Sequence, residues 1–202
     1  MCGRVYMAPA NPELRELVRE MNRARLAERF RKDDQDLPSP EGEVFPSSVL
    51  PVLAVNRNGE QRVFPMKWGF AQPRGRLLIN ARVETAPEKP TFREAWQRHR
   101  CVIPASGYFE WEHDEKKKPG QKYTLLPENP GLIWLAGLYR MEENLPAFVI
   151  LTRPADSSLA WMHDRMPVML AWEEARRWIR PEADPAPLAD RCIRTMAWQK
   201  AV

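Results

Sequence analysis

The chain has 202 residues, of which 44% are hydrophobic, which is enough to bury the core of one large domain. Its three cysteines form no CxxC pair, and with three histidines they show no metal-ligand spacing, so we expect no disulfide framework, no metal and no cofactor. We find no secretory segment and no apolar run near the ~18 residues of a membrane span, which argues against a membrane protein and predicts a reduced, cytoplasmic location.

The net charge of +4 is modest, but the cations are concentrated in the middle of the chain. Between Arg57 and Arg100 there are ten Lys or Arg and four Asp or Glu, a net of +6. Arginine suits phosphate contacts, and eight tryptophans exceed what a core needs, so some are expected on a surface that stacks a flat group. This pattern suggests single-stranded nucleic acid as a partner. The alternative is a solvated face of salt bridges.

The first predicted elements are a short strand and an amphipathic helix. Asn11-Pro12 opens this helix, which is expected to run to about Phe30. Residues 32–43 are acidic and almost free of apolar side chains, which predicts a flexible loop. Strands are then predicted at 49–55, 61–68 and 77–79, with a hairpin turn at 56–59 and with Pro65 placing its strand at an edge or bulge.

The second half alternates strands with single short helices. Thr91 and Glu94 form a capping box for a helix that ends near His99. The other predicted elements are strands at 101–104, 107–112, 122–126, 132–139, 147–152 and 191–198, a hairpin loop at 113–121, a helical turn at 157–162 and a helix at 173–179. No βαβ alternation is present. The expected fold is therefore α+β, a single domain over residues 1–202 with a curved, mostly antiparallel, barrel-like β-sheet and a few flanking helices.

The first four residues, Met1-Cys2-Gly3-Arg4, offer unusual chemistry. If Met1 is removed, Cys2 carries an α-amine and a thiol on adjacent carbons, with ordinary pKa values of about 7.7–8.0 and about 8.5. The amine can condense with an aldehyde, and the thiol can then close a thiazolidine ring. Alternatively, the amine can act as base for its own thiol. Cys2 can also be an incidental residue at a frayed chain end, and Cys101 and Cys192, in apolar segments, are expected to be inert core.

Loss of water during imine formation needs a proton donor, which a partly buried Glu or a His can supply. Glu110 is a lone acid between two aromatic residues, which is unusual. Taken singly, Glu110 also fits a surface acid on a strand, His163 a loop histidine and Asn80 a turn asparagine.

Seven short motifs, in chain order, resemble those of one known family. They are Met1-Cys2-Gly3-Arg4, Trp68-Gly69, Ile79-Asn80-Ala81-Arg82-Val83-Glu84-Thr85, Glu88-Lys89-Pro90, Cys101-Val102-Ile103-Pro104-Ala105, Gly107-Tyr108-Phe109-Glu110-Trp111 and His163-Asp164-Arg165-Met166-Pro167. Each motif alone is weak, but the ordered set is specific and covers nearly the whole chain. It resembles the SRAP (SOS-response-associated peptidase) family, whose members crosslink to abasic sites in single-stranded DNA.

The resemblance implies that Cys2 forms a stable thiazolidine with the ring-opened sugar of an abasic site and shields the lesion. It implies that Asn80 orients the amine or the sugar, that Glu110 shuttles protons during ring opening and imine formation, and that His163 acts on the sugar hydroxyl and in reversal. It further implies contacts with DNA: phosphate contacts by Arg4, Arg82 and Arg165, stacking by Trp68, and a sugar lining from Pro46 and Thr152.

The chain departs from the family pattern at two places. Glu43 stands where many members have an asparagine three residues before the proline. The segment 71–79, between Phe70 and Asn80, is shorter than in many members, which puts the strand-junction preference in doubt.

Two other functions stay open. One is a cysteine peptidase or amidohydrolase of the N-terminal nucleophile type, able to remove Met1 autocatalytically. The other is a non-covalent single-strand binding module in which Cys2 is incidental. We expect a monomer whose partner is single-stranded DNA with abasic sites.

Overall fold

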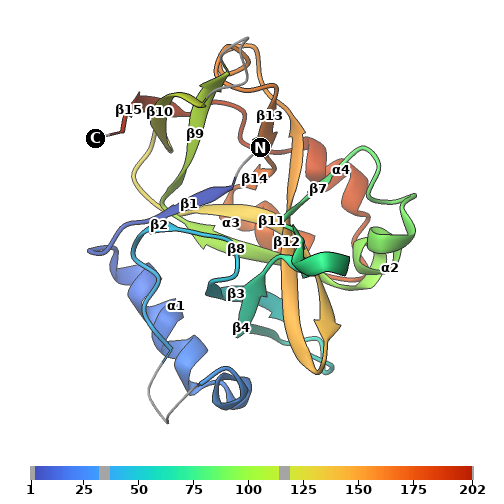
Figure 1. Ribbon diagram of the computed structural model, residues 1–202. Coiled ribbons are helices and arrows are strands. Elements are labelled where there is room, and N and C mark those ends of the chain that lie inside the picture. Colours follow the sequence, from blue (N-terminus) through green and yellow to red (C-terminus); the bar gives the residue numbers. More distant parts are fainter. Residues whose placement is uncertain (1–2, 32–36, 114–118, 202) are drawn as a thin grey trace.

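The computed structural model describes residues 3–31, 37–113 and 119–201. Strands dominate, and helices lie around them (Figure 1). The strands are β1 (Arg4–Met7), β2 (Gly42–Val44), β3 (Val49–Val55), β4 (Gln61–Trp68), β5 (Phe70–Ala71), β6 (Leu77–Leu78), β7 (Asn80–Arg82), β8 (Arg100–Ala105), β9 (Gly107–His113), β10 (Pro119–Leu126), β11 (Ile133–Glu142), β12 (Leu145–Pro154), β13 (Arg165–Pro167), β14 (Met169–Leu170) and β15 (Ala197–Lys200). The helices are α1 (Pro12–Arg23), α2 (Pro90–Arg98), α3 (Trp172–Trp178) and α4 (Pro185–Asp190), with 3₁₀ turns η1 (Arg25–Arg29) and η2 (Pro73–Gly75).

A closed barrel forms the centre of the fold and confirms the predicted class. The strand order β12-β4-β3-β8-β11 closes because β11 also pairs with β12. The pairing is antiparallel except between β12 and β4. The predicted strands 49–55 and 61–68 have the bounds of β3 and β4. Pro65 is tolerated because β12 pairs only with Lys67 and Trp68, so β4 has no ladder neighbour on that side at the proline.

Alternate residues of the barrel strands enter two different hydrophobic clusters. Val52, Ile103 and Ile150 belong to one cluster, together with Trp68 and Phe148. The intervening residues belong to the other cluster, which also contains apolar side chains of α1, α2 and α3. The first cluster therefore fills the barrel, and the second lies between its outer wall and the helices, as the period of two in a strand requires.

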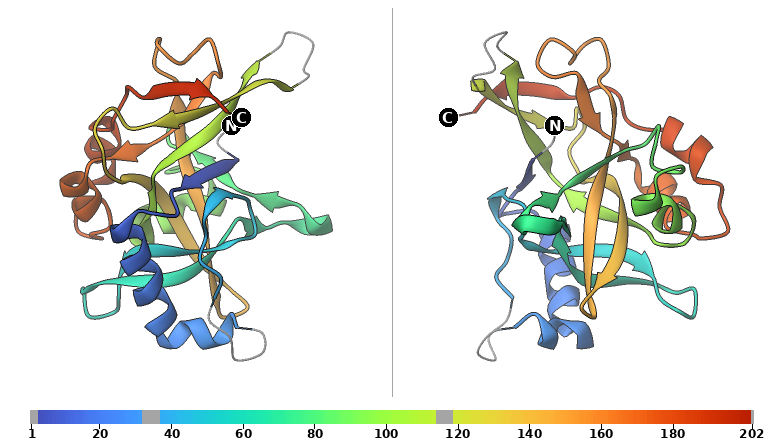
Figure 2. Two further views of the ribbon diagram at one scale, coloured as in Figure 1. Left: turned by 90° about the vertical axis from the view of Figure 1, so that its left-hand side faces the viewer. Right: turned by 45° about the vertical axis from the view of Figure 1, so that its right-hand side comes forward.

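A second, five-stranded sheet lies beside the barrel, with the order β15-β10-β9-β1-β2 (Figures 1 and 2). All its pairings are antiparallel. Val5, Tyr108 and Leu125 point from one face of this sheet into the cluster that fills the barrel. The other face combines half-buried side chains, such as Tyr6 and Lys122, with the buried Phe109. A single sheet was expected, whereas the five-stranded sheet and the barrel are separate sheets that share one core.

Helix α1 begins as predicted and ends earlier. The Asn11 side chain accepts a hydrogen bond from the Leu14 backbone N–H at 3.0 Å, and a proline follows in the first turn. The predicted continuation to Phe30 is wrong, because Ala24 has an extended backbone and η1 starts a new direction. This break lets Ala27 reach the core.

Two other expectations are also wrong, one about the start of a helix and one about a strand. Helix α2 begins at Pro90, with Lys89 as N-cap and no side-chain capping bond, so Thr91 and Glu94 form no capping box. The predicted strand 191–198 is largely irregular, and α4 precedes it. Only residues 197–200 form a strand, where β10 offers a partner edge.

Within the described residues, none of the helices has the length and hydropathy that a membrane crossing requires. Over the same ranges, no three His, Cys, Asp or Glu side chains are grouped as metal ligands would be. Of the described cysteines, Cys101 is buried inside the barrel, and burial raises the pKa of its thiol. Cys192 departs from the expected inert core position: it is half-buried, and its sulfur contacts the Arg153 guanidinium.

Candidate functional site

Parallel pairing of β7 with β12 brings three predicted site residues together. The register sets Asn80 opposite Ile150 and Arg82 opposite Thr152. Asn80 and Thr152 are buried, whereas Arg82 is exposed. All three line a cavity of about 280 Å³ that also contains the exposed Lys89. The cavity thus combines an amide and a hydroxyl with two cations, a set that suits a sugar and its phosphates.

Arg165 is held at the edge of this cavity by two partners. Its guanidinium donates two hydrogen bonds to the Glu84 carboxylate, at 2.6 and 2.9 Å, and one to the Thr152 carbonyl oxygen at 2.7 Å. The Arg165 side chain is 11% exposed. The Arg165 guanidinium lowers the pKa of the Glu84 carboxyl below its ordinary value of 4.5, chiefly through these hydrogen bonds. Arg165 therefore connects β13 to the segment after β7, and its phosphate contact stays a prediction.

His163 lies in the turn just before β13. Its Nδ1 accepts a hydrogen bond from the Arg165 backbone N–H at 2.9 Å and is 2.8 Å from a carboxylate oxygen of Asp164. The first contact needs an unprotonated Nδ1, and the second needs a protonated one. When Nδ1 accepts from Arg165, the neutral imidazole carries its proton on Nε2, and the Asp164 carboxylate, which is exposed, is screened by water.

Glu110 occupies an unusual position in β9. Its neighbour Tyr108, two residues earlier on the same face, is core, and the side chain of Glu110 is itself only 5% exposed. One carboxylate oxygen lies 3.3 Å from the Trp111 backbone N–H. A carboxylate on the inward face of a sheet carries a desolvation cost, so this position indicates a chemical role more strongly than a surface acid would.

Strand β1 leads the N-terminal end of the described chain to Glu110. Arg4 pairs with Phe109 and Val5 with Tyr108, and the same register continued by one residue sets Gly3 opposite Glu110. Cys2 lies outside the described residues. The described chain therefore begins beside the buried carboxylate.

On the outer face of the same sheet, cations alternate with aromatic rings. The Arg4 guanidinium lies 4.2 Å from the centroid of the Phe45 ring, and the Lys122 ammonium lies 4.3 Å from that of Phe109. Glu43 connects the two cations, with its oxygens 3.4 Å from Arg4 Nε and 2.6 Å from Lys122 Nζ. Cations and rings in alternation are typical of surfaces that bind single strands. Glu43, the residue that departs from the family pattern, partly neutralises this surface.

The prediction that Trp68 stacks against DNA is corrected by its burial. The side chain is 0% exposed and stacks on Phe148 inside the barrel, with ring planes 9° apart. Its indole N–H donates to the Ile79 carbonyl at 3.1 Å, and its backbone carbonyl accepts from Ser47, in the turn that contains Pro46. Trp68 therefore positions the residue before Asn80 and the half-buried Pro46 turn.

Seven of the ten predicted residues form two groups. Asn80, Arg82, Thr152, His163 and Arg165 lie on or beside β7, β12 and β13, whereas Arg4 and Glu110 lie on β1 and β9. Aromatic contacts connect the segments that carry the two groups: Trp161, two residues before His163, packs on Tyr123, the register partner of Glu110, with ring centroids 5.3 Å apart. The candidate site is thus the junction of the two sheets.

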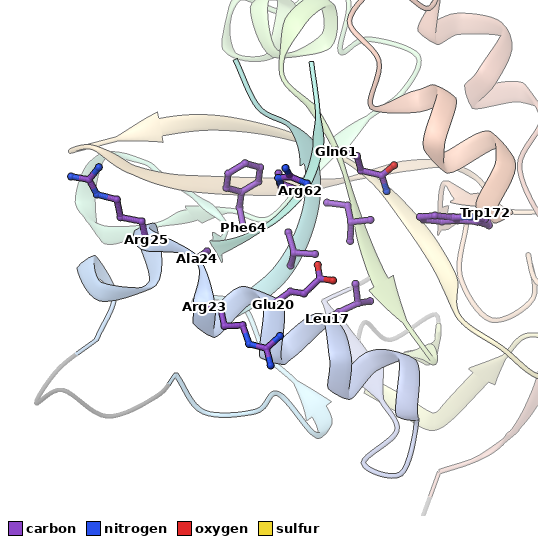
Figure 3. A pocket seen from close by; sticks show the side chains of 11 residues that line it. Leu17, Glu20, Arg23, Ala24, Arg25, Gln61, Arg62, Phe64 and Trp172 are labelled. Atoms are coloured by element: carbon purple, nitrogen blue, oxygen red, sulfur yellow. The ribbon is translucent and has the colours of Figure 1, made fainter. Parts of the chain in front are cut away.

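A larger cavity, of about 740 Å³, lies elsewhere (Figure 3). It is formed between α1 and β4, where Arg23, Arg62 and Phe64 line it, and it contains none of the predicted site residues. Its size alone gives no reason to place the chemistry there.

Sequence reasoning missed Glu84, Lys122 and Tyr123. Glu84 belongs to the same motif as Asn80, and that shared motif was the available signal for its role. Lys122 and Tyr123 lie in a charged stretch, and only the pairing of β9 with β10 shows which faces they occupy.

Comparison with known proteins identifies a family for the whole chain. The model of the family described as SOS response associated peptidase (SRAP) matches residues 1–201. The abasic site processing protein YedK of Escherichia coli (strain K12) is 32% identical over 192 residues, covering 90% of this chain and 81% of its own. The abasic site processing protein YoqW of Bacillus subtilis (strain 168) is 35% identical over 164 residues, covering 72% of each chain.

Solved structures share the fold. A protein from Bacteroides thetaiotaomicron has a TM-score of 0.72 at 22% identity, covering 98% of this chain and 91% of its own. A phage-related protein from Bordetella bronchiseptica has a TM-score of 0.73 at 22% identity, covering 99% of this chain and 94% of its own. At this identity the likeness extends to the fold alone.

The Glu84–Arg165 pair predicts a specific pH dependence of stability. Because the folded pKa of Glu84 is depressed, the stabilisation is complete above about pH 4.5 and is lost as the pH falls through the lower folded value. We expect Glu84→Gln to lower the free energy of unfolding by about 0.5–1 kcal/mol at pH 7. The difference from wild type should shrink as the pH is lowered below about 4.5 in urea unfolding. Glu88→Gln, at an exposed position nearby, is the control, and a difference that persists at low pH would contradict this account.

Proposed function

Because the chain belongs to the SOS response associated peptidase (SRAP) family, we propose that it captures abasic sites in single-stranded DNA through a covalent bond to Cys2. The similarity to relatives named as abasic site processing proteins supports an abasic site as the lesion that is bound. The observation that carries the chemistry is the buried Glu110 carboxylate, which lies where β1 brings in the N-terminal end of the described chain.

The proposed reaction joins two atoms of Cys2 to one carbon of the lesion. After removal of Met1, the α-amine of Cys2 attacks the aldehyde carbon of the ring-opened sugar, and the resulting carbinolamine loses one water to give an imine. The Cys2 thiolate then attacks the imine carbon, a C–S bond forms, and the nitrogen takes up a proton. The thiazolidine product contains both new bonds, and one water has left in total.

The side chains at the junction suit the proton transfers. Glu110 protonates the departing hydroxyl and accepts protons from the amine. The Nε2–H of His163 donates to the sugar hydroxyl during ring opening. Asn80 orients the sugar without changing charge, and its neighbours Arg82 and Lys89 accept the flanking phosphates.

The outer face of the five-stranded sheet supplies the entry surface. Arg4 and Lys122 attract the DNA backbone, and the exposed Phe45 ring beside Arg4 offers a plane for an unstacked base. In this proposal the Glu43 carboxylate competes with phosphate for both cations.

The first prediction from the proposed function concerns the covalent bond to Cys2. Intact mass spectrometry of the protein, before and after mixing with abasic single-stranded DNA, should show loss of Met1 and a heat-stable adduct one water lighter than the sum of its parts. Cys2→Ala should form no adduct and should retain salt-sensitive binding. A stable adduct with Cys2→Ala would refute the proposal, and a processed wild type without adduct would favour a peptidase or a plain binding module.

The second prediction concerns proton transfer. Glu110→Gln keeps the shape of the buried side chain and removes its ability to exchange a proton, so we expect the single-turnover crosslinking rate to fall by about 100-fold or more. Glu112→Gln is the matched control, because Glu112 lies two residues further on the same face and is exposed. An unchanged rate for Glu110→Gln, with folding verified by circular dichroism, would remove Glu110 from the reaction.

The third prediction concerns charge at the entry surface. Glu43→Gln releases Arg4 and Lys122 from a partly exposed ion pair, so DNA binding should tighten by about two- to fivefold at low salt. The log–log slope of affinity against salt should also steepen. Glu41→Gln, at an exposed position two residues away, should change neither quantity. Fluorescence anisotropy with a labelled oligonucleotide measures both, and weaker binding of Glu43→Gln would contradict the competition.

A further inference from the structure

Three aromatic side chains from distant parts of the chain meet near the candidate site. Tyr123 of β10, Trp161 of the β12–β13 loop and Trp198 of β15 form a mutually packed triangle. Their ring centroids are 5.2–5.5 Å apart, and the rings meet at 66–88°. We call these three residues the aromatic triangle.

The triangle is only partly used for packing. Tyr123 is buried, whereas Trp161 is 42% exposed and Trp198 is 49% exposed. The indole N–H of Trp161 donates to the Ser158 carbonyl at 3.0 Å, which helps to fix that ring within its loop. Two large rings held in place and open to solvent form a rigid surface on which a flat group can stack.

The triangle also adjoins both halves of the candidate site. Trp161 precedes His163 by two residues, and Tyr123 is the register partner of Glu110 across β9 and β10. A strand of DNA that brings an abasic sugar to Glu110 and His163 therefore has its neighbouring nucleotides within reach of the triangle.

A nucleobase fits this surface better than a phosphate does, because the surface is aromatic. A cation for the adjoining phosphate is present in Lys200, which is exposed and pairs in register with Tyr123. An abasic site also leaves its flanking bases without a stacking partner on one side, so these bases gain most from a protein ring.

We propose that the aromatic triangle is a stacking subsite for a base that flanks the abasic site. The proposal rests on the proposed function, since it needs single-stranded DNA at the junction of the sheets. Its occupant is one nucleobase, and its role is to increase affinity and to hold the lesion in register with Glu110 and His163.

The test measures affinity separately from crosslinking. The probes are single-stranded oligonucleotides with one tetrahydrofuran, an abasic analogue that has no aldehyde, and either ordinary bases on both sides or a second tetrahydrofuran at one flanking position. We expect Trp161→Ala and Trp198→Ala each to weaken binding of the first probe by about 5- to 150-fold. Trp161→Phe should retain most of the affinity.

The matched control is Trp172→Ala. Trp172 is 40% exposed but packs on Trp134, away from the triangle, so its removal should leave the affinity unchanged. Trp198 provides a second variant because it lies on β15, outside the loop of His163. A loss shared by Trp161→Ala and Trp198→Ala therefore reports stacking and not a displaced histidine.

The loss of a flanking base from the probe and the loss of a Trp ring from the protein should have non-additive effects on affinity. Wild type should lose affinity when one flanking base is missing, and Trp161→Ala should lose little more on that probe. Equal affinities of wild type, Trp161→Ala and Trp198→Ala, within about twofold, would overturn the subsite and leave the triangle as edge packing. Crosslinking of wild type to a natural abasic site reports the proposed function independently: a missing adduct with intact coupling refutes the crosslink and retains the subsite.

Discussion

The hydrogen-bonding of β12 on both edges is the constraint on which the rest of the structure depends. The first half of this strand lies between β11 and β4 and closes the barrel. Its second half lies between β13 and β7, and there it sets Thr152 beside Arg82 and beside the strand that follows His163. A shift of one residue in β12 would turn its core side chains outward and separate these groups together. Stability and site geometry therefore depend on one register.

The pleat of β9 and β10 separates two kinds of chemistry. Successive side chains point to opposite faces, so Glu110 lies inward among core residues while Phe109 and Lys122 lie outward. In the proposed function the outward face attracts the DNA and the inward carboxylate transfers protons. Because one sheet carries both, changes at Arg4 and Lys122 should alter affinity with little effect on rate, and a change at Glu110 should do the reverse.

The local sequence pattern was sufficient to predict those elements whose structure is determined by residues close together in the chain. The bounds of β3 and β4 were predicted because apolar runs and an Asn-Gly turn act over a few residues. The pairing of β7 with β12 joins segments about 70 residues apart, and no local signal contains it. The helix break at Ala24 is connected with the burial of Ala27 in the core, which local sequence does not show. The DNA contact predicted for Trp68 is wrong because a motif gives the position of a residue but not the direction of its side chain.

In the proposed function, the position of β1 explains how a chain end can serve a precise reaction. The first residues of a domain usually fray, and a frayed nucleophile would have to be immobilised at every encounter with a lesion. Here β1 has hydrogen-bonded neighbours on both sides, β9 and β2, so folding fixes the backbone from Arg4 onward beside Glu110. The entropy of that ordering is lost once, during folding, and not in the reaction. On this reasoning, pairing across β1 is as necessary to the proposed crosslink as the carboxylate itself, although none of its backbone bonds touches the lesion.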